Sequence, residues 1–196
     1  MEKRAETMER MDKSISILGI AGSLRKDSFN KALLQVAAEL VPEEARLEVF
    51  DLDGIPPYNQ DLDSQPPDRV KEFKEKIKAA DAILIVTPEY NYSIPGVLKN
   101  AIDFASRPYG DNAWNGKPVA VMGASIGMLG TARAQYHLRQ SFVFLNMYPI
   151  NQPEVMVPFV EQKVDQNGRL TDDKTRKKVR ELLVALIAWT KKIKSA

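Results

Sequence analysis

The segment that most constrains the fold is DAILIVT, residues 81–87, because nearly every position in it is apolar. A strand with one face in water alternates polar and apolar residues, whereas a strand without that alternation is buried on both faces. Such strands lie in the middle of parallel sheets that helices cover on each side. The segment therefore predicts an α/β protein built around a parallel sheet.

The arrangement of a strand followed by a helix recurs along the chain. Further strands are predicted at 14–20, 46–52, 118–124 and 154–158, and helices at 29–40, 70–77, 95–106, 129–145 and 179–193. Right-handed crossovers place helices on both faces and favour a five-stranded parallel sheet in the order 2-1-3-4-5. We expect a single three-layer α/β/α domain over residues 14–196, preceded by a flexible extension at 1–13 that lacks the apolar segment of a secretory signal.

The composition excludes several classes of function. The 196 residues contain no cysteine, which rules out disulfides, thiolate nucleophiles and cysteine-held zinc or iron–sulfur clusters. Twenty-eight basic and 26 acidic side chains give a net charge of only +2, so bulk electrostatics predict neither a nucleic-acid nor a membrane partner. No apolar run approaches the roughly 20 residues of a membrane span. We expect a cytoplasmic protein.

The turn after the first strand has the residue types of a phosphate site. It reads Gly22-Ser23-Leu24-Arg25, followed by Ser28 and Asn30 at the start of the next helix. Backbone amides at a helix start carry the positive end of the helix dipole and attract anions. The simpler alternative is that Ser28 or Asp27 only caps the helix and that Arg25 is solvated. The position, at the first β-α turn of an open parallel sheet, favours a ligand.

Two missing motifs limit the kind of phosphate. The chain has no G-x-x-x-x-G-K-[ST] sequence for nucleotide hydrolysis. It also has no G-x-G-x-x-G sequence, which would let a dinucleotide pyrophosphate approach closely. The turn therefore favours a monophosphate.

Two further turns follow strands that should lie beside the first. TPEYNYSIPG, residues 87–96, combines two prolines with polar and aromatic side chains that could address and cover a planar ring, or could form only a rigid surface turn. GASIGMLG, residues 123–130, offers small residues and free amides where backbone can approach a flat ligand. Glycine-rich turns are common, so the convergence of the three turns is the stronger indication.

These turns resemble those of the NAD(P)H-dependent FMN reductase family of flavodoxin-like enzymes, which includes quinone, azo and chromate reductases. The shared motifs are GSLR-x-x-S-x-N in the first turn, PEYN-x-S-x-P-G-x-L-K-N-A-I-D after the third strand, and GAS-x-G after the fourth. The likeness covers about residues 14–160. It implies a flavodoxin-like fold with bound FMN, and NADPH or NADH as the co-substrate.

The resemblance also implies roles for individual residues. The FMN phosphate would be held by Ser23, Arg25, Ser28 and Asn30, with Leu24 among the cofactor-binding residues. The isoalloxazine and ribityl chain would be lined by Pro88, Glu89, Tyr90 and Asn91, and the pyrimidine end would be approached by Ser125 and Gly127. Arg107 could bind an anionic substrate or the phosphate of the nicotinamide cofactor, or could simply be exposed.

By this likeness, FMN takes a hydride from the nicotinamide and passes electrons to a quinone, azo, flavin or chromate acceptor in ping-pong order. No acid–base side chain is required, so we predict no catalytic residue and no metal, and we place His137 at the surface or an interface. We also expect a homodimer or homotetramer in which the loop at 55–60 covers the flavin. The loop at 108–116 should border the substrate opening.

Two competing functions use the same kind of sheet. A flavodoxin-like electron carrier is the alternative, but such carriers usually have a strongly acidic surface and a Thr/Ser/Gly-rich first turn. A phosphoacceptor signalling domain needs acidic residues after the first strand and an aspartate at the end of the third. Here those places hold Ala21-Gly22 and Thr87-Pro88, which excludes it.

Overall fold

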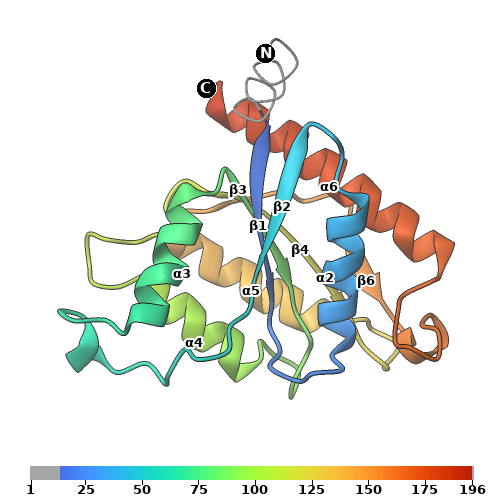
Figure 1. Cartoon of the computed structure of the whole chain (residues 1–196), viewed down its shortest axis with the longest axis horizontal. Coiled ribbons are helices and arrows are strands. Elements are labelled where there is room, and N and C mark those ends of the chain that lie inside the picture. The colour runs from blue at the N-terminus through green and yellow to red at the C-terminus, as the bar shows by residue number, and fades with distance from the viewer. Residues whose placement is uncertain (1–13, 196) are drawn as a thin grey trace, which may run out of the picture.

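The computed structural model describes residues 14–195, so the predicted extension at 1–13 lies outside the described residues. Figure 1 shows the strands at the centre of the molecule with the helices around them. The strands are β1 (Ile15–Ala21), β2 (Ala45–Phe50), β3 (Ala82–Val86), β4 (Pro118–Ala124), β5 (Tyr148–Pro149) and β6 (Val155–Val157). The helices are α2 (Phe29–Leu40), α3 (Asp68–Ala79), α4 (Gly96–Ala105), α5 (Ala132–Leu145) and α6 (Asp173–Lys194), with short 3-10 turns η1 (Gln60–Leu62) and η2 (Val160–Gln162).

The sheet has the predicted topology. Its described strands pair in parallel in the order β2-β1-β3-β4-β5, which confirms the three-layer flavodoxin-like fold. The fifth position differs from the prediction of one strand at 154–158, because β5 and β6 share it and pair with opposite ends of β4. A two-residue strand that includes a proline carries no alternation, so the sequence does not reveal β5.

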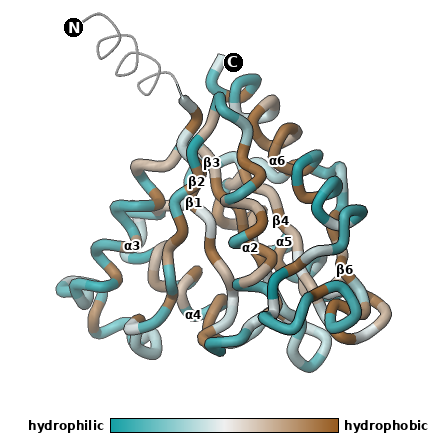
Figure 2. Tube along the Cα trace, turned by 45° about the vertical axis from the view of Figure 1, so that its right-hand side comes forward, coloured by the Kyte–Doolittle hydropathy of each residue, from teal (hydrophilic) through white to brown (hydrophobic). Residues whose placement is uncertain are grey.

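Two hydrophobic clusters, one on each face of the sheet, form the core. Helices α2 and α6 contribute to the first, and α3, α4 and α5 to the second. The side chains of β3 alternate between them: Leu84 belongs to the first cluster, and Ile83 and Ile85 belong to the second. All of β3 is buried, as the apolar run predicts. In Figure 2 the hydrophobic segments accordingly run through the centre of the molecule.

Two helices begin next to the predicted site. Ser28 caps α2, because its hydroxyl oxygen accepts from the amides of Asn30 at 3.2 Å and Lys31 at 3.4 Å. Helix α5 begins at Ala132, later than the predicted start at 129. Gly130 and Thr131 have φ angles of 55° and 77°, which lie in the left-handed region and cannot continue into a right-handed helix. The connection after β4 is therefore longer than predicted.

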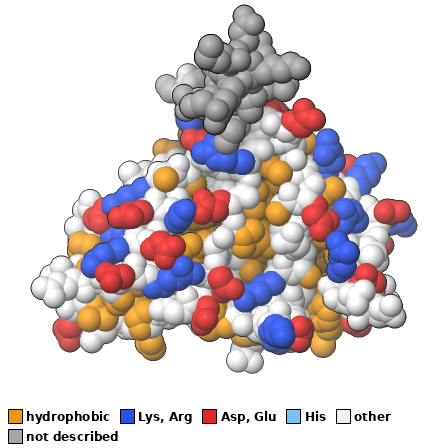
Figure 3. All heavy atoms as spheres, in the orientation of Figure 1, with side chains coloured by type: hydrophobic (Ala, Val, Ile, Leu, Met, Phe, Trp, Pro, Cys, Tyr) orange, Lys and Arg blue, Asp and Glu red, His pale blue; other side chains and the backbone are white. Residues whose placement is uncertain are grey.

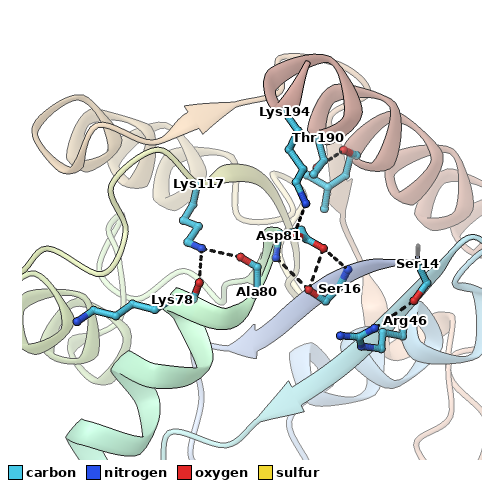
Figure 4. A network of polar contacts seen from close by, with 10 residues as sticks. Ser14, Ser16, Arg46, Lys78, Ala80, Asp81, Lys117, Thr190 and Lys194 are labelled. Carbon is cyan, nitrogen blue, oxygen red and sulfur yellow. Dashed lines mark hydrogen bonds and ion pairs between the residues drawn. The ribbon is translucent and has the colours of Figure 1, made fainter. Parts of the chain in front are cut away.

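A polar network lies where the strands begin, at the edge of the sheet opposite the predicted site (Figure 4). The Asp81 carboxylate accepts from the backbone amide of Ser16 at 2.8 Å, from the Ser16 hydroxyl at 3.0 Å and from Lys194 Nζ at 2.6 Å. Lys117 donates to two carbonyls at the end of α3. The network fastens the last turn of α6 to the start of β1 and to the residue before β3.

Asp81→Asn should cost about 1–2 kcal/mol of unfolding free energy at neutral pH and little in acid. Burial opposes ionisation of the Asp81 carboxyl, but hydrogen bonds from Lys194 and Ser16 outweigh it and hold its pKa below the usual value. A carboxyl with a lowered folded pKa stabilises the fold above its unfolded pKa, and the contribution is lost as the pH falls through the folded pKa. Urea unfolding should therefore show the difference shrinking below about pH 4. An equal difference at pH 7 and pH 3 would contradict this assignment.

Charged side chains of both signs are interspersed on the face of the molecule that Figure 3 shows. This mixture accords with the net charge of +2 and gives that face no large patch of one sign. Within residues 14–195, no helix combines the length and the apolar character that crossing a membrane requires.

Candidate functional site

The turns after β1, β3 and β4 lie at one edge of the sheet, as predicted. Ala21 pairs with Val86, and Val86 pairs with Met122, so the three strands end at nearly the same level. The Gly22 amide donates to the Val86 carbonyl at 2.9 Å, and the Thr87 amide donates to the Met122 carbonyl at 2.9 Å. In Figure 1 these turns lie at the lower side, and the end of α6 lies at the top.

The turn after β1 presents donors to a ligand. Ser23 and Ser28 are buried, and each hydroxyl oxygen accepts from a backbone amide, which leaves its own O–H free to donate. Within the described part of the chain, the amides of Leu24, Lys26 and Asp27 have no hydrogen-bond acceptor. The side chains of Leu24 and Arg25 are exposed, and the Arg25 guanidinium carbon lies 5.4 Å from the Phe29 ring centre. The capping role of Ser28 therefore coexists with a cluster of free donors.

For Asn30, which the resemblance assigns to the phosphate, the structure shows a contact with the end of β4. Its side chain is only 3% exposed, and both of its polar atoms pair with Ala124 at the end of β4. Asn30 Oδ1 accepts from the Ala124 amide at 2.9 Å, and Nδ2 donates to the Ala124 carbonyl at 3.0 Å. The carboxamide thus joins the turn after β1 to the turn after β4.

The turn after β3 is a tight two-residue hairpin. Tyr90 and Ser93 exchange backbone hydrogen bonds of 3.1 and 2.9 Å, and the two residues between them have positive φ angles. This is the geometry of a type I′ turn, which asparagine tolerates well and tyrosine poorly. Tyr92 is held there by Arg133, whose guanidinium carbon lies 3.4 Å from the centre of its ring. Pro88 is buried beneath the hairpin, and Tyr90 and Asn91 are exposed.

The side chain of Glu89, a residue that the resemblance assigns to the ring of the cofactor, points to the start of α5. The Glu89 side chain is 7% exposed, and its carboxylate forms an ion pair with the Arg133 guanidinium. It also accepts from the backbone amides of Arg133 at 3.0 Å and Ala134 at 3.2 Å. Thr131 provides no side-chain cap for α5, so Glu89 caps that helix from another turn. The hydrogen bonds to Glu89 and Tyr92 outweigh partial desolvation and raise the pKa of Arg133, which stays charged.

The turn after β4 presents backbone at close range. Ser125 Oγ accepts from the Gly127 amide at 3.0 Å, and the Ser125 amide donates to the Val157 carbonyl at 3.0 Å in β6. A side chain at Gly130 would put its Cβ 2.8 Å from the Val157 nitrogen, so glycine is required there. Ser125 and Gly127 therefore lie in a narrow turn, and its close contacts with β6 fix its shape.

Sequence reasoning missed the residues that anchor these turns. Arg133 and His137 lie on one side of α5, and His137 Nδ1 lies 3.0 Å from Ser93 Oγ. His137 is exposed, as expected of a surface residue. The anchoring pairs join residues 44 positions apart, and no local pattern signals such pairs.

The structure also shows where three other predicted elements lie. Arg107 follows α4, a ten-residue helix about 15 Å long that leads away from the turn after β3. The loop at 108–116 then leads to the start of β4, at the opposite edge of the sheet from the turns. The loop at 55–60 packs on α4 of its own chain, where Asn100 accepts from the Tyr58 amide at 2.7 Å and donates to the Pro56 carbonyl at 2.8 Å.

The arrangement fits FMN and gives no sign of a metal centre. The free amides and the two hydroxyls suit a monophosphate at the start of α2, and the neighbouring turns offer narrow backbone and exposed aromatic side chains for a flat ring. Among residues 14–195 there is no group of three or more His, Cys, Asp or Glu residues that could hold a metal ion.

Comparisons with known proteins agree with this geometry. The family model for NADPH-dependent FMN reductases matches residues 15–162. An NAD(P)H-dependent FMN reductase of Pseudomonas aeruginosa is 51% identical over 185 residues, which are 94% of this chain and 100% of that protein. A 2-hydroxy-1,4-benzoquinone reductase of a Burkholderia species is 45% identical and is covered to 97%, with 91% of this chain aligned.

A solved structure gives the same result. The flavoenzyme NAD(P)H:acceptor oxidoreductase of Paracoccus denitrificans superposes with a TM-score of 0.83 at 38% identity, covering 91% of this chain and 98% of that one. The matches confirm the predicted resemblance, and with it the enzyme class and the FMN and nicotinamide cofactors for which the family is named. Because the family model and these relatives span most of the chain, the protein belongs to the NADPH-dependent FMN reductase family.

Proposed function

We propose that this protein is an FMN-containing reductase that uses NADPH or NADH to reduce quinones and similar flat acceptors. The observation that carries the proposal is the meeting of three turns, the first of them rich in free donors, at the edge where the strand order reverses, between β1 and β3. FMN, when bound, supplies the hydride-transfer and electron-transfer chemistry. The protein holds the cofactor in place and leaves a surface on which flat substrates can stack.

The phosphate end of the site would lie at the start of α2. The hydroxyls of Ser23 and Ser28 and the free amides of Leu24, Lys26 and Asp27 would donate to the phosphate oxygens. Arg25 would supply a positive charge at the rim, and the dipole of α2 would add to it. Asn30 would act through Ala124 instead of through the phosphate.

The ring would lie between the turns after β3 and β4. Pro88, which is buried, would make the turn after β3 rigid, and Tyr90, with 53% of its surface exposed, would flank the ring. Ser125 and Gly127 would bring backbone groups to the pyrimidine end, where hydrogen-bond donors stabilise negative charge on the reduced ring. This arrangement requires no acid–base side chain.

The proposed acceptors rest on a relative and on the open surface of the site. The quinone reductase activity in the name of the Burkholderia relative supports quinones as acceptors. We extend this to azo compounds, free flavins and chromate, because a surface open enough to stack a nicotinamide selects weakly by shape. Since nicotinamide and acceptor would occupy the same surface in turn, we propose ping-pong kinetics, and we place the enzyme in the cytoplasm, where NAD(P)H is available.

Mixing the FMN-loaded protein with NADPH, and separately with NADH, without oxygen tests this function. At least one of the two should rapidly bleach the visible absorbance of the flavin. A quinone added afterwards should restore the colour. If neither nucleotide bleaches the flavin but a ferredoxin-type protein partner does, the protein is an electron carrier and the proposal fails.

We also propose that the chain forms a homodimer or homotetramer through the outer face of α5. This α5 face consists of Tyr136, Val143 and Phe144, which are 51%, 83% and 73% exposed. Apolar side chains this exposed on one side of a helix mark an association surface. In the turns of the site, Met128 and Tyr92 are also exposed, at 73% and 68%.

The double substitution Val143→Glu with Phe144→Glu should dissociate the oligomer, because burying two carboxylates in an apolar interface is costly. In sedimentation velocity at micromolar concentration, the wild type should sediment faster than a monomer of 22.0 kDa, and the variant should move toward that size. Val184→Glu, at a 47% exposed position on α6, is the matched control and should sediment like the wild type. A monomeric wild type would contradict the proposal.

A further inference from the structure

The carboxamide of Asn30 takes the place of a strand that has ended. Strand β3 stops at Val86, opposite Met122, whereas β4 continues to Ala124. Alternate residues of a strand direct their backbone groups to the same side, so Ala124 faces the side on which Met122 accepts from Thr87. The next residue, Ser125, donates in the opposite direction to β6. Within residues 14–195, no backbone group pairs with Ala124 on the β3 side, and the Asn30 side chain supplies both the acceptor and the donor.

This contact sets the spacing between two turns of the site. Asn30 lies in the first turn of α2 and follows in sequence the free amides of the turn after β1. Ala124 immediately precedes Ser125 and the turn after β4. The two hydrogen bonds, 2.9 and 3.0 Å long, run between a planar carboxamide and one residue, and both residues are 3% exposed. A buried pair of this kind fixes both the distance and the angle between the two segments.

We propose that Asn30 is a positioning residue of the flavin site, which aligns the turn after β4 with the phosphate turn and is not itself a phosphate ligand. The inference rests on the proposed FMN site. The two possible roles of Asn30, phosphate ligand and positioning residue, differ in which flavins they help to bind. A phosphate ligand affects the binding of FMN alone, whereas a residue that aligns the ring-binding turn also affects a flavin without a phosphate. Riboflavin is that flavin, because it has the same ring and ribityl chain.

The test is to titrate the full-length apoprotein with FMN and with riboflavin and to follow the quenching of flavin fluorescence. Asn30→Ala should lower the affinity for both flavins by a similar factor, about tenfold or more. Arg25→Ala is the matched comparison at the exposed rim of the same turn, and it should weaken FMN while leaving riboflavin unchanged. If Asn30→Ala weakens FMN alone, or weakens neither flavin, the inference is overturned while the proposed function stands. A wild type that binds neither flavin overturns both.

Asn30→Asp keeps the test decisive if the alanine variant does not fold. It preserves the shape of the side chain but places a carboxylate oxygen against the Ala124 carbonyl. In its protonated form the new carboxyl group can both accept from the Ala124 amide and donate to the Ala124 carbonyl. Relative to the wild type, the variant should therefore bind both flavins at least fivefold more tightly at pH 5 than at pH 8. The same relative affinity at both pH values overturns the inference.

Discussion

Gly123→Ala should lower the unfolding free energy by about 3 kcal/mol or more, which for a chain of this size lowers Tm by roughly 6–12 °C. A Cβ at this position would lie 2.1 Å from Thr131 Oγ1 and 2.3 Å from the carbonyl oxygen of Thr87. The backbone carbonyl cannot move aside as a flexible side chain could, so β4 and the turns after β3 and β4 would have to separate. Thermal unfolding of the apoprotein measures the effect, and flavin binding should be lost with it.

Gly96→Ala is the matched control for this prediction. A Cβ there meets no atom within 4 Å, and Gly96 stands at the first position of α4. Alanine favours a helix over glycine by up to about 1 kcal/mol, so this variant should be as stable as the wild type or slightly more stable. If Gly123→Ala unfolds at the same temperature as Gly96→Ala, the turns after β3 and β4 do not pack as closely as the structure shows.

Glu89→Ala should cost about 2–4 kcal/mol of unfolding free energy. The substitution leaves the Arg133 guanidinium without its carboxylate and frees two backbone amides at the start of α5. A carboxylate at that position also complements the positive end of the helix dipole. The hairpin after β3 would lose its anchor, so FMN affinity should fall together with stability. Urea unfolding of the apoprotein and FMN titration measure the two effects.

Asp103→Ala provides the comparison for Glu89→Ala. Asp103 also forms an ion pair, with Lys99 one helical turn away at 2.8 Å, but both side chains are more than a third exposed. Exposed pairs at this spacing contribute about 0.3–0.5 kcal/mol. Equal losses in the two variants would mean that Glu89 is no more than a surface charge, and its role in holding the hairpin would have to be abandoned.

The fold was predictable because its signals are local. The apolar run at 81–87 predicts a strand buried on both faces, and β3 has that burial. The apolar periodicity along the chain predicts the strand–helix alternation from which the sheet order follows. Strand β5 escaped prediction for the same reason, since two residues that include a proline give no periodic signal. The start of α5 was misplaced because Gly130 and Thr131 adopt left-handed backbone that their residue types do not require.

The meeting of the three turns was also predictable, but the contacts of their side chains were not. Topology alone puts the turns after β1, β3 and β4 at one edge, and the residue types in the first of them indicate a phosphate. Asn30 and Glu89 are polar residues in ligand-facing motifs, so the sequence suggests that both face the ligand. The structure instead pairs each of them with backbone groups far along the chain.

By itself, therefore, the sequence determined the α/β architecture, the strand order and the edge at which the three turns meet, and it indicated the chemical class of the proposed ligand, because hydrophobic periodicity and turn composition act over a few neighbouring residues. Only the tertiary structure decided which polar side chains remain free for that ligand and which brace the turns. The reason is that buried polar groups must find hydrogen-bond partners. For Asn30 and Glu89 those partners lie 94 and 44–45 positions away, where no local pattern reaches.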